Sequence, residues 1–142
     1  MRTCLFFLTL FISVTYMSCQ YQDGKVPKVV KENFNAKYPN ENDPDWEIDK
    51  NDNFEASFKK DGIHYRADFS PNGDWIETEN NIDKKDLPEV IQDIIDTKYE
   101  AYKIVEIEEV THYQKGFFYD VEITKDGNKQ DVEFLKSGAI IN

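Results

Sequence analysis

The side chains that could carry out catalysis are scattered through this 142-residue sequence. Its two histidines, His64 and His112, lie far apart in the chain, and serines are few. A lone histidine in a strand is typical of a solvated surface residue. No two carboxylates are spaced so that one would act as an acid and the other as a base across an apolar cleft, and no glycine-rich phosphate loop is present. The sequence therefore predicts a non-enzymatic protein without a cofactor.

One stretch resembles a calcium-binding loop. Asp49, Asn51 and Asn53 place oxygen atoms at its first, third and fifth positions. The sixth position of such a loop is glycine and the twelfth a bidentate glutamate, but this sequence has Phe54 and Lys60 there. We therefore interpret the stretch as a turn and predict no metal site.

The charge of the chain restricts its partners. The sequence has 17 basic and 28 acidic residues, a net charge of −11. Such a surface repels the phosphates of nucleic acids and the head groups of anionic lipids, so we expect no nucleic acid partner. The charge favours solubility, and it also favours a cationic partner.

The secondary structure is clearest in residues 53–77, which are predicted to form three strands. Asp61-Gly62 is a strong hairpin signal, because a type I′ turn needs positive φ at both central residues. Pro71 and Gly73 mark a second turn, and Trp75 opens the third strand. Apolar residues alternate with polar ones, as in a half-buried strand: Phe54, Ala56, Phe58, Tyr65, Ala67 and Phe69.

A degenerate copy of this pattern follows later in the chain. Residues 58–62 align with 123–127, and Gly73 aligns with Gly138. Upstream, residues 26–30 align with 87–91, and Lys37-Tyr38 matches Lys98-Tyr99. We therefore predict an α+β fold made of a tandem repeat, 26–80 and 81–142, in which each copy is a helix followed by a four-stranded antiparallel meander.

The two helices are predicted from their apolar residues. The first spans about Pro27 to Tyr38. Residues 78–85 are polar and are interpreted as the boundary between the copies. The second helix is expected to begin at Asp86, which forms a capping-box pattern with Glu89. Its apolar stripe is Leu87, Val90, Ile91, Ile94, Ile95 and Tyr99. Downstream, a strand over residues 104–113 is expected to contain a bulge at 108–109.

We expect both helices to cover one face of the sheet and to leave the other face open. Trp46 and Phe117 are interpreted as core residues. An open antiparallel face is either solvated or a binding surface, and arginine and aromatic residues commonly anchor interfaces. The candidate binding face comprises Lys59, His64, Arg66, Trp75, Phe118, Asp120 and Glu122. The expected partner is an unknown protein; the alternative is a small ligand or a cation bound on the acidic face of the second copy.

The N-terminus is predicted to be a targeting segment. Residues 1–18 contain Arg2 and then an apolar run that is too short to span a bilayer. Ser18-Cys19 is typical of a lipoprotein signal, in which the cysteine becomes the lipidated first residue; a plain secretory signal is the alternative. Residues 19–25 would form a tether, so the protein would be exported to the periplasm or cell envelope and would meet the membrane only through Cys19.

The chain resembles the PepSY-like proteins of Bacteroidetes, which are small exported proteins described as β-lactamase-inhibitor-like. The resemblance rests on the secretory cysteine, the two Val/Leu-Pro helix starts and the repeated Lys-Asp-Gly hairpins over roughly residues 26–142. It implies tandem α+β repeats whose sheets form one extended concave surface, which in the inhibitor grips an enzyme. The family offers no functional motif to match, so no inhibitory residue is carried over. The polar open face also departs from an aromatic-rich gripping surface, which counts against inhibition of a β-lactamase.

Overall fold

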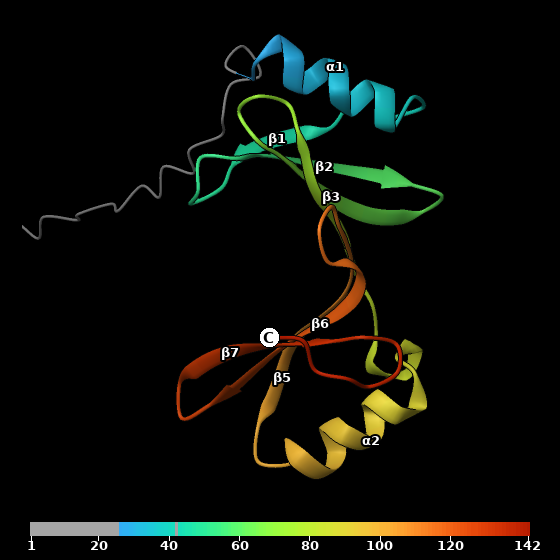
Figure 1. Cartoon of the computed structure of the whole chain (residues 1–142), viewed down its shortest axis with the longest axis vertical. Coiled ribbons are helices and arrows are strands. Elements are labelled where there is room, and N and C mark those ends of the chain that lie inside the picture. The colour runs from blue at the N-terminus through green and yellow to red at the C-terminus, as the bar shows by residue number, and fades with distance from the viewer. Residues whose placement is uncertain (1–25, 42) are drawn as a thin grey trace, which may run out of the picture.

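The computed structural model describes residues 26–41 and 43–142, and the predicted targeting segment and the predicted tether, which begins at Cys19, lie outside these residues (Figure 1). Two α-helices and a seven-stranded antiparallel sheet make up the fold. In chain order the elements are α1 (Lys28–Lys37), β1 (Asp45–Ile48), β2 (Phe54–Lys60), β3 (Ile63–Phe69), β4 (Trp75–Asn81), the 3₁₀ turn η2 (Lys84–Asp86), α2 (Glu89–Lys98), β5 (Lys103–His112), β6 (Gly116–Lys125) and β7 (Asn128–Phe134).

All seven strands form one continuous sheet in chain order. The predicted α+β class and antiparallel sheet are confirmed, but the four-stranded meander is seen only in the first half. In the second half the fourth strand is reduced to a single bridge between Phe134 and Ile140. β4 extends into the segment 78–85 that was interpreted as the boundary between the copies; it ends at Asn81 and pairs with β5. The strand joins the two halves into one sheet.

Both helices cover the same face of this sheet. Ala67, beneath α1, pairs with Thr78 of β4, and Thr78 pairs with Thr111 of β5. Thr111 in turn pairs with Phe117 of β6, two residues before the buried Tyr119 beneath α2. Paired residues share a face, and residues two apart on one strand do so as well. The opposite face carries no helix among the described residues.

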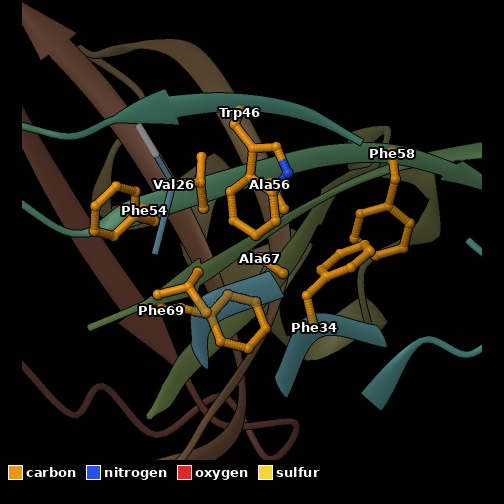
Figure 2. Close-up of a cluster of buried hydrophobic side chains, with 9 residues drawn as sticks. Val26, Phe34, Trp46, Phe54, Ala56, Phe58, Ala67 and Phe69 are labelled. Atoms are coloured by element: carbon orange, nitrogen blue, oxygen red, sulfur yellow. The ribbon is translucent and has the colours of Figure 1, made fainter. Parts of the chain in front are cut away.

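The first core lies between α1 and strands β1–β3 (Figure 2). Phe34 of α1 is at its centre, with its ring edge-on to the rings of Trp46 and Phe58. Its ring centroid is 5.3 Å from that of Phe58, a preferred aromatic geometry. The predicted core position of Trp46 is confirmed. The cluster comprises Val26, Val30, Phe34, Trp46, Phe54, Ala56, Phe58, Ala67 and Phe69.

The second core lies between α2 and strands β5–β7. Ile91 and Ile95 of α2 are buried in it, whereas Val90 of the predicted stripe is 43% exposed. Phe117, predicted to be core, is also 43% exposed. The cluster comprises Leu87, Ile91, Ile95, Ile107, Tyr119, Val121, Ile123, Val132 and Phe134. The buried face of α2 therefore contains fewer residues than the apolar stripe in the sequence predicted.

Equivalent residues begin the two helices. Pro27 is the N-cap of α1 and Pro88 the N-cap of α2, and their carbonyls accept hydrogen bonds from the amides of Val30 and Ile91. Proline suits a helix start because it removes an amide that would lack an intrahelical partner. The predicted capping box is wrong, since Asp86 belongs to η2 and no side chain caps α2.

Equivalent turns also seat the two repeats against their helices. Gly73 and Gly138 have φ angles of +89° and +86°. The Gly73 amide donates to Ser70, and the Gly138 amide donates to Leu135, each at 2.8 Å. A Cβ at Gly73 would lie 2.8 Å from Asn33 Nδ2 of α1. These shared details support an internal repeat.

The predicted position of the bulge in the strand at 104–113 is wrong: the irregularity in the β5–β6 pairing lies between residues 104 and 106, not at 108–109.

Candidate functional site

The uncovered face of the sheet is concave. In Figure 1, α1 and α2 lie at opposite ends of the molecule, each outside its own half of the sheet, so the uncovered faces of the two halves turn toward each other. We call this surface the open face. Twelve carboxylates are placed on it by the strand register: Asp45, Glu47, Glu55, Asp68, Glu77, Glu79, Glu106, Glu108, Asp120, Glu122, Asp131 and Glu133.

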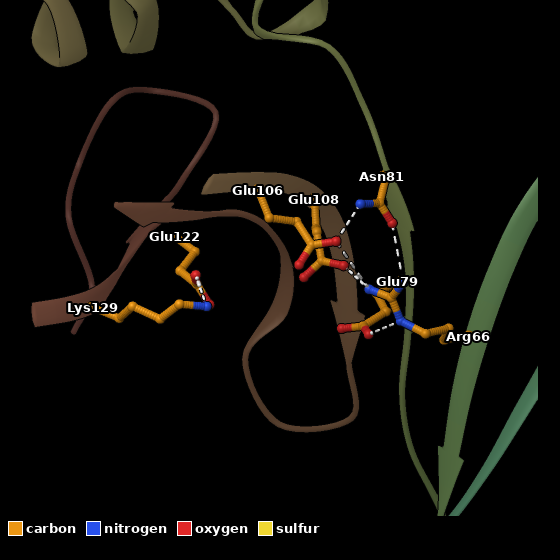
Figure 3. A network of polar contacts seen from close by, with 7 residues as sticks. All are labelled: Arg66, Glu79, Asn81, Glu106, Glu108, Glu122 and Lys129. Atoms are coloured by element: carbon orange, nitrogen blue, oxygen red, sulfur yellow. Dashed lines mark hydrogen bonds and ion pairs between the residues drawn. The ribbon is translucent and has the colours of Figure 1, made fainter. Parts of the chain in front are cut away.

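Arg66 of β3 is the centre of an ion-pair network on this face (Figure 3). Its Nε donates to Glu79 Oε1 at 2.7 Å, its Nη1 donates to Asn81 Oδ1 at 3.1 Å, and its Nη2 pairs with Glu108. Glu106 lies 3.9 Å from the same guanidinium. The network therefore joins β3, β4 and β5 across the middle of the sheet, and Arg66 is held by this chain's own carboxylates.

Several carboxyl groups of the open face have raised pKa values. Burial, followed by the charges of Glu55 and Glu79, raises the pKa of Asp68 from 3.8 to about 7. Burial and the charge of Glu79 raise the pKa of Glu108 to about 7, despite the neighbouring Arg66. Burial and neighbouring carboxylates raise the pKa of Asp120 to about 6. The negative charge of the open face therefore decreases as the pH falls from 8 to 6.

Stability should depend on pH for the same reason. Around pH 6 the folded chain holds protons that the unfolded chain, with ordinary carboxyl pKa values, has released, so folding is favoured as pH falls through 7. We expect a higher melting temperature at pH 6 than at pH 8. Asp68→Asn should raise the melting temperature at pH 8 and reduce this dependence, whereas Asp93→Asn on the exposed side of α2 should not. Thermal unfolding followed by circular dichroism tests this. If the difference in melting temperature between pH 6 and pH 8 were the same in Asp68→Asn as in the unmodified protein, the explanation would be contradicted.

A small apolar centre lies within the charged surface. Val110 and Phe118 are paired on the open face and are 2% and 3% exposed. Lys115 lies over the Phe118 ring, 5.2 Å from its centroid, and pairs with Glu133 at 2.5 Å. The lysine stem and the surrounding carboxylates therefore shield this ring. Phe118 is on the predicted face, but the prediction that its side chain is available as an interface anchor is wrong.

The structure brings the other predicted residues together only in part. Lys59 and His64 pair with each other and are exposed, while Asp120 and Glu122 are half-buried on the same face. Glu122 pairs with Lys129 at 2.6 Å.

Trp75 lies on the opposite face, so its assignment to the open face is wrong. Its indole packs against the first core and donates to Thr78 Oγ1 at 2.8 Å, and Lys37 lies 3.5 Å from the ring centroid. The reason is a bulge near Phe69, where the β3–β4 register shifts so that Trp75 pairs with Phe69 on the helix side.

Sequence reasoning missed the open-face carboxylates of β4 and β5, which are Glu77, Glu79, Glu106 and Glu108. It also missed Lys115. From the sequence, Glu79 is interpreted as part of a polar boundary. No side chain of β4 is fully buried, so this strand lacks the clear alternation of apolar and polar residues that identifies β2 and β3. The signal was present in the alternation of Glu77 and Glu79 with Ile76 and Thr78. Cross-strand partners such as Glu108 require the register, which the sequence did not supply.

Other features of the molecule bear on ligand chemistry. A groove of about 810 Å³ opens between the start of β3, the end of β4 and the start of β5, where Ile63, Ile104 and Val105 are exposed. His112 accepts hydrogen bonds from the amides of Gln114 and Lys115, so it closes a turn. Within residues 26–41 and 43–142, no group of three or more His, Cys, Asp or Glu is arranged to hold a metal ion. The helices found in this part of the chain are too short or too polar to cross a membrane.

Several solved structures share this fold. A DUF2874 family protein from Bacteroides uniformis has a TM-score of 0.69 and 18% sequence identity, covering 82% of this chain and 86% of that one. A BLIP-like protein from Bacteroides fragilis has a TM-score of 0.67 and 19% identity, covering 82% and 83%. A protein from Bacteroides eggerthii described as "putative periplasmic" has a TM-score of 0.68 and 16% identity, covering 82% and 86%. At these identities the likeness establishes the fold alone.

A comparison at the level of sequence identifies the family. No curated protein matches the chain. The model of the family described as "Putative beta-lactamase-inhibitor-like, PepSY-like" matches residues 16–62 and 52–142. The description is of an inhibitor-like protein, not of a catalyst, and the two matches together cover nearly the whole chain. The predicted resemblance is thus confirmed, and the chain belongs to the PepSY-like, β-lactamase-inhibitor-like family.

Proposed function

We propose that this protein is a non-enzymatic, exported binding module that holds a partner protein on its open face and regulates or inhibits an envelope or secreted enzyme. Export agrees with the periplasmic description of the Bacteroides eggerthii protein of the same fold. Attachment to the membrane would come from a lipid on Cys19, as the sequence suggests.

The observation that carries the proposal is the concave sheet face that no helix covers. Both helices of the described chain pack on the opposite side, and the two halves form one continuous sheet. The open face therefore offers an extended surface with a fixed backbone. Pre-organised surfaces bind with a smaller loss of conformational entropy.

The charge of the open face indicates the kind of partner. Twelve carboxylates outnumber the basic residues placed near them, and Arg66 is already paired within the face. A partner with a basic surface fits this potential, and long-range attraction would speed its encounter. Binding should weaken at high ionic strength and also as the pH falls from 8 to 6, because Asp68, Glu108 and Asp120 then become protonated.

Charge reversal on the open face tests the proposal. The immobilised mature protein should capture a partner from envelope extract, and Glu77→Lys should reduce the captured amount by about tenfold. Glu77 is half-buried in the middle of the open face, beside His112 of β5. The control is Glu100→Lys, the same charge change at an exposed turn after α2.

The comparison is valid only if both variants fold as the unmodified protein does, and circular dichroism of each variant checks this. Loss of capture in Glu77→Lys with capture retained in Glu100→Lys supports a partner on the open face. Equal capture by the two variants would contradict it.

A further inference from the structure

The helix side of the sheet is least covered where its two halves meet. α1 packs on strands β1–β3 and α2 on strands β5–β7, and the two helices lie at opposite ends of the molecule (Figure 1). Ile63 is on the same face of β3 as Ala67, and Ile104 of β5 pairs with the buried Ile123. Both Ile63 and Ile104 are therefore on the helix side, between the two helices.

A bulge in β5 exposes further apolar surface at this place. The β5–β6 register shifts between Ile104 and Glu106, so Val105 has no partner in β6. A bulge of this kind redirects side chains and increases the local twist. Ile104 and Val105 are 37% and 46% exposed, and Ile63 is 46% exposed. Exposed aliphatic side chains that lie together are typical of an interaction site.

These three side chains line the groove of about 810 Å³, which we call the waist groove. Its volume is within the range of about 300–1,000 Å³ that is usual for ligand sites. Ile82 and Ile107 also line it, and the Ile82 amide donates to the Ile107 carbonyl at 2.9 Å. Ile107 belongs to the second core, and Ile82 packs against that core. The apolar floor of the groove is therefore held in place before anything binds.

The rim of the waist groove is acidic. The charged residues that line the groove are Lys84, Asp83, Asp86, Glu106 and Glu109. Lys84 pairs with Asp96 of α2, so its charge is compensated within the chain. Among the residues that the structure describes, Asp86 and Glu109 form no ion pair. The groove thus combines an aliphatic floor with uncompensated negative charge, and it complements an occupant that is aliphatic and cationic.

We propose that the waist groove is a second docking site, which binds an extended segment of a partner protein in which an aliphatic residue is directly followed by lysine or arginine. The aliphatic side chain packs on Ile63, Ile104 and Val105, and the basic side chain meets the acidic rim.

A protein segment fits the groove because the groove continues onto the open face. Asn81 and Glu106 line the groove, and they also bond to each other within the Arg66 network (Figure 3). A partner on the open face can therefore reach the groove around the ends of β4 and β5. Binding in the groove does not require the open face to be occupied.

Three synthetic peptides with blocked ends test the proposal. Gly-Ile-Arg-Ile-Gly has both features, Gly-Ile-Glu-Ile-Gly reverses the charge, and Gly-Ser-Arg-Ser-Gly lacks the aliphatic side chains. Titrated into ¹⁵N-labelled protein, the first peptide should shift the amide signals of Ile63, Val105 and Glu109. It should also bind about tenfold more tightly than each of the other two.

Variants of the protein assign the binding to the groove. Val105→Ser should weaken binding of the first peptide by about tenfold, whereas Val29→Ser, at a residue of α1 that is 40% exposed outside the groove, should not. Glu109→Lys should make the glutamate peptide bind more tightly than the arginine peptide, and Glu100→Lys, outside the groove, should not. The ¹⁵N spectrum of each variant checks its fold, and the comparison of the three peptides on the unmodified protein needs no variant.

Glu77→Lys separates this site from the partner site on the open face. It should reduce capture of the open-face partner, and the first peptide should still shift the same groove amides.

The proposal would be overturned if the first peptide did not bind at millimolar concentrations, bound no more tightly than either of the others, or shifted only amides of the open face. Butylammonium that shifts the groove amides with the affinity of the first peptide would assign the groove to a small cation. Concentration-dependent shifts of these amides without any peptide would assign it to a second copy of the chain. Either result would overturn the proposal as well.

Discussion

Replacing Phe69 or Phe134 by alanine is expected to lower the free energy of unfolding by about 3–5 kcal/mol. Both rings are fully buried, and they occupy equivalent positions beneath α1 and α2. The loss combines the transfer free energy of the ring with the cost of the cavity that remains. Urea denaturation of each variant measures it, and since β4 and β5 join the halves, each variant should unfold in one transition.

Phe117→Ala is the matched control for these two substitutions. Its ring lies on the same sheet face but is 43% exposed, beyond the cover of α2. The expected loss is below about 1 kcal/mol. A loss at Phe117 equal to that at Phe69, or a loss below about 1 kcal/mol at Phe69, would contradict the assignment of the two cores.

Gly73→Ala is expected to cost more than about 2 kcal/mol, for two separable reasons. At a φ of +89°, a side chain is strained by about 1–2 kcal/mol. The new Cβ would also lie 3.1 Å from the Val29 carbonyl oxygen and closer still to Asn33 Nδ2, so α1 would have to shift. Chemical denaturation measures the total.

Gly62→Ala separates the two causes. Gly62 has nearly the same φ, +87°, but nothing lies within 4 Å of its added Cβ. The difference between the two variants is therefore the cost of pushing the turn away from α1. Equal losses in Gly62→Ala and Gly73→Ala would mean that the contact with α1 contributes nothing.

The hairpins and the buried strand faces could be predicted from the sequence because their signals are local. Asp61-Gly62 and Asp126-Gly127 form the expected turns with positive φ angles, and the alternation from Phe54 to Phe69 matches the first core. The internal repeat was visible because both copies keep the same turns. These features depend on residues a few positions apart.

The open face was predicted only in outline, because its chemistry depends on contacts between distant strands. Arg66 is a predicted interface anchor, but the sequence does not show that it pairs with Glu79 and Glu108, which are 13 and 42 residues away. Trp75 was placed on the wrong face because a bulge reverses the simple alternation. Phe118 was predicted to be accessible, but Lys115 covers its ring.

Site-specific photo-crosslinking in living cells tests the central claim most directly. A photoreactive residue would replace Lys59 or Glu122 on the open face, and in matched controls it would replace Glu32 of α1 or Asp93 of α2, which lie on the helices. We predict a covalent adduct with one envelope protein from both open-face positions and none from the helix positions. Adducts that form only from Glu32 or Asp93 would contradict the assignment of the open face as the partner-binding surface.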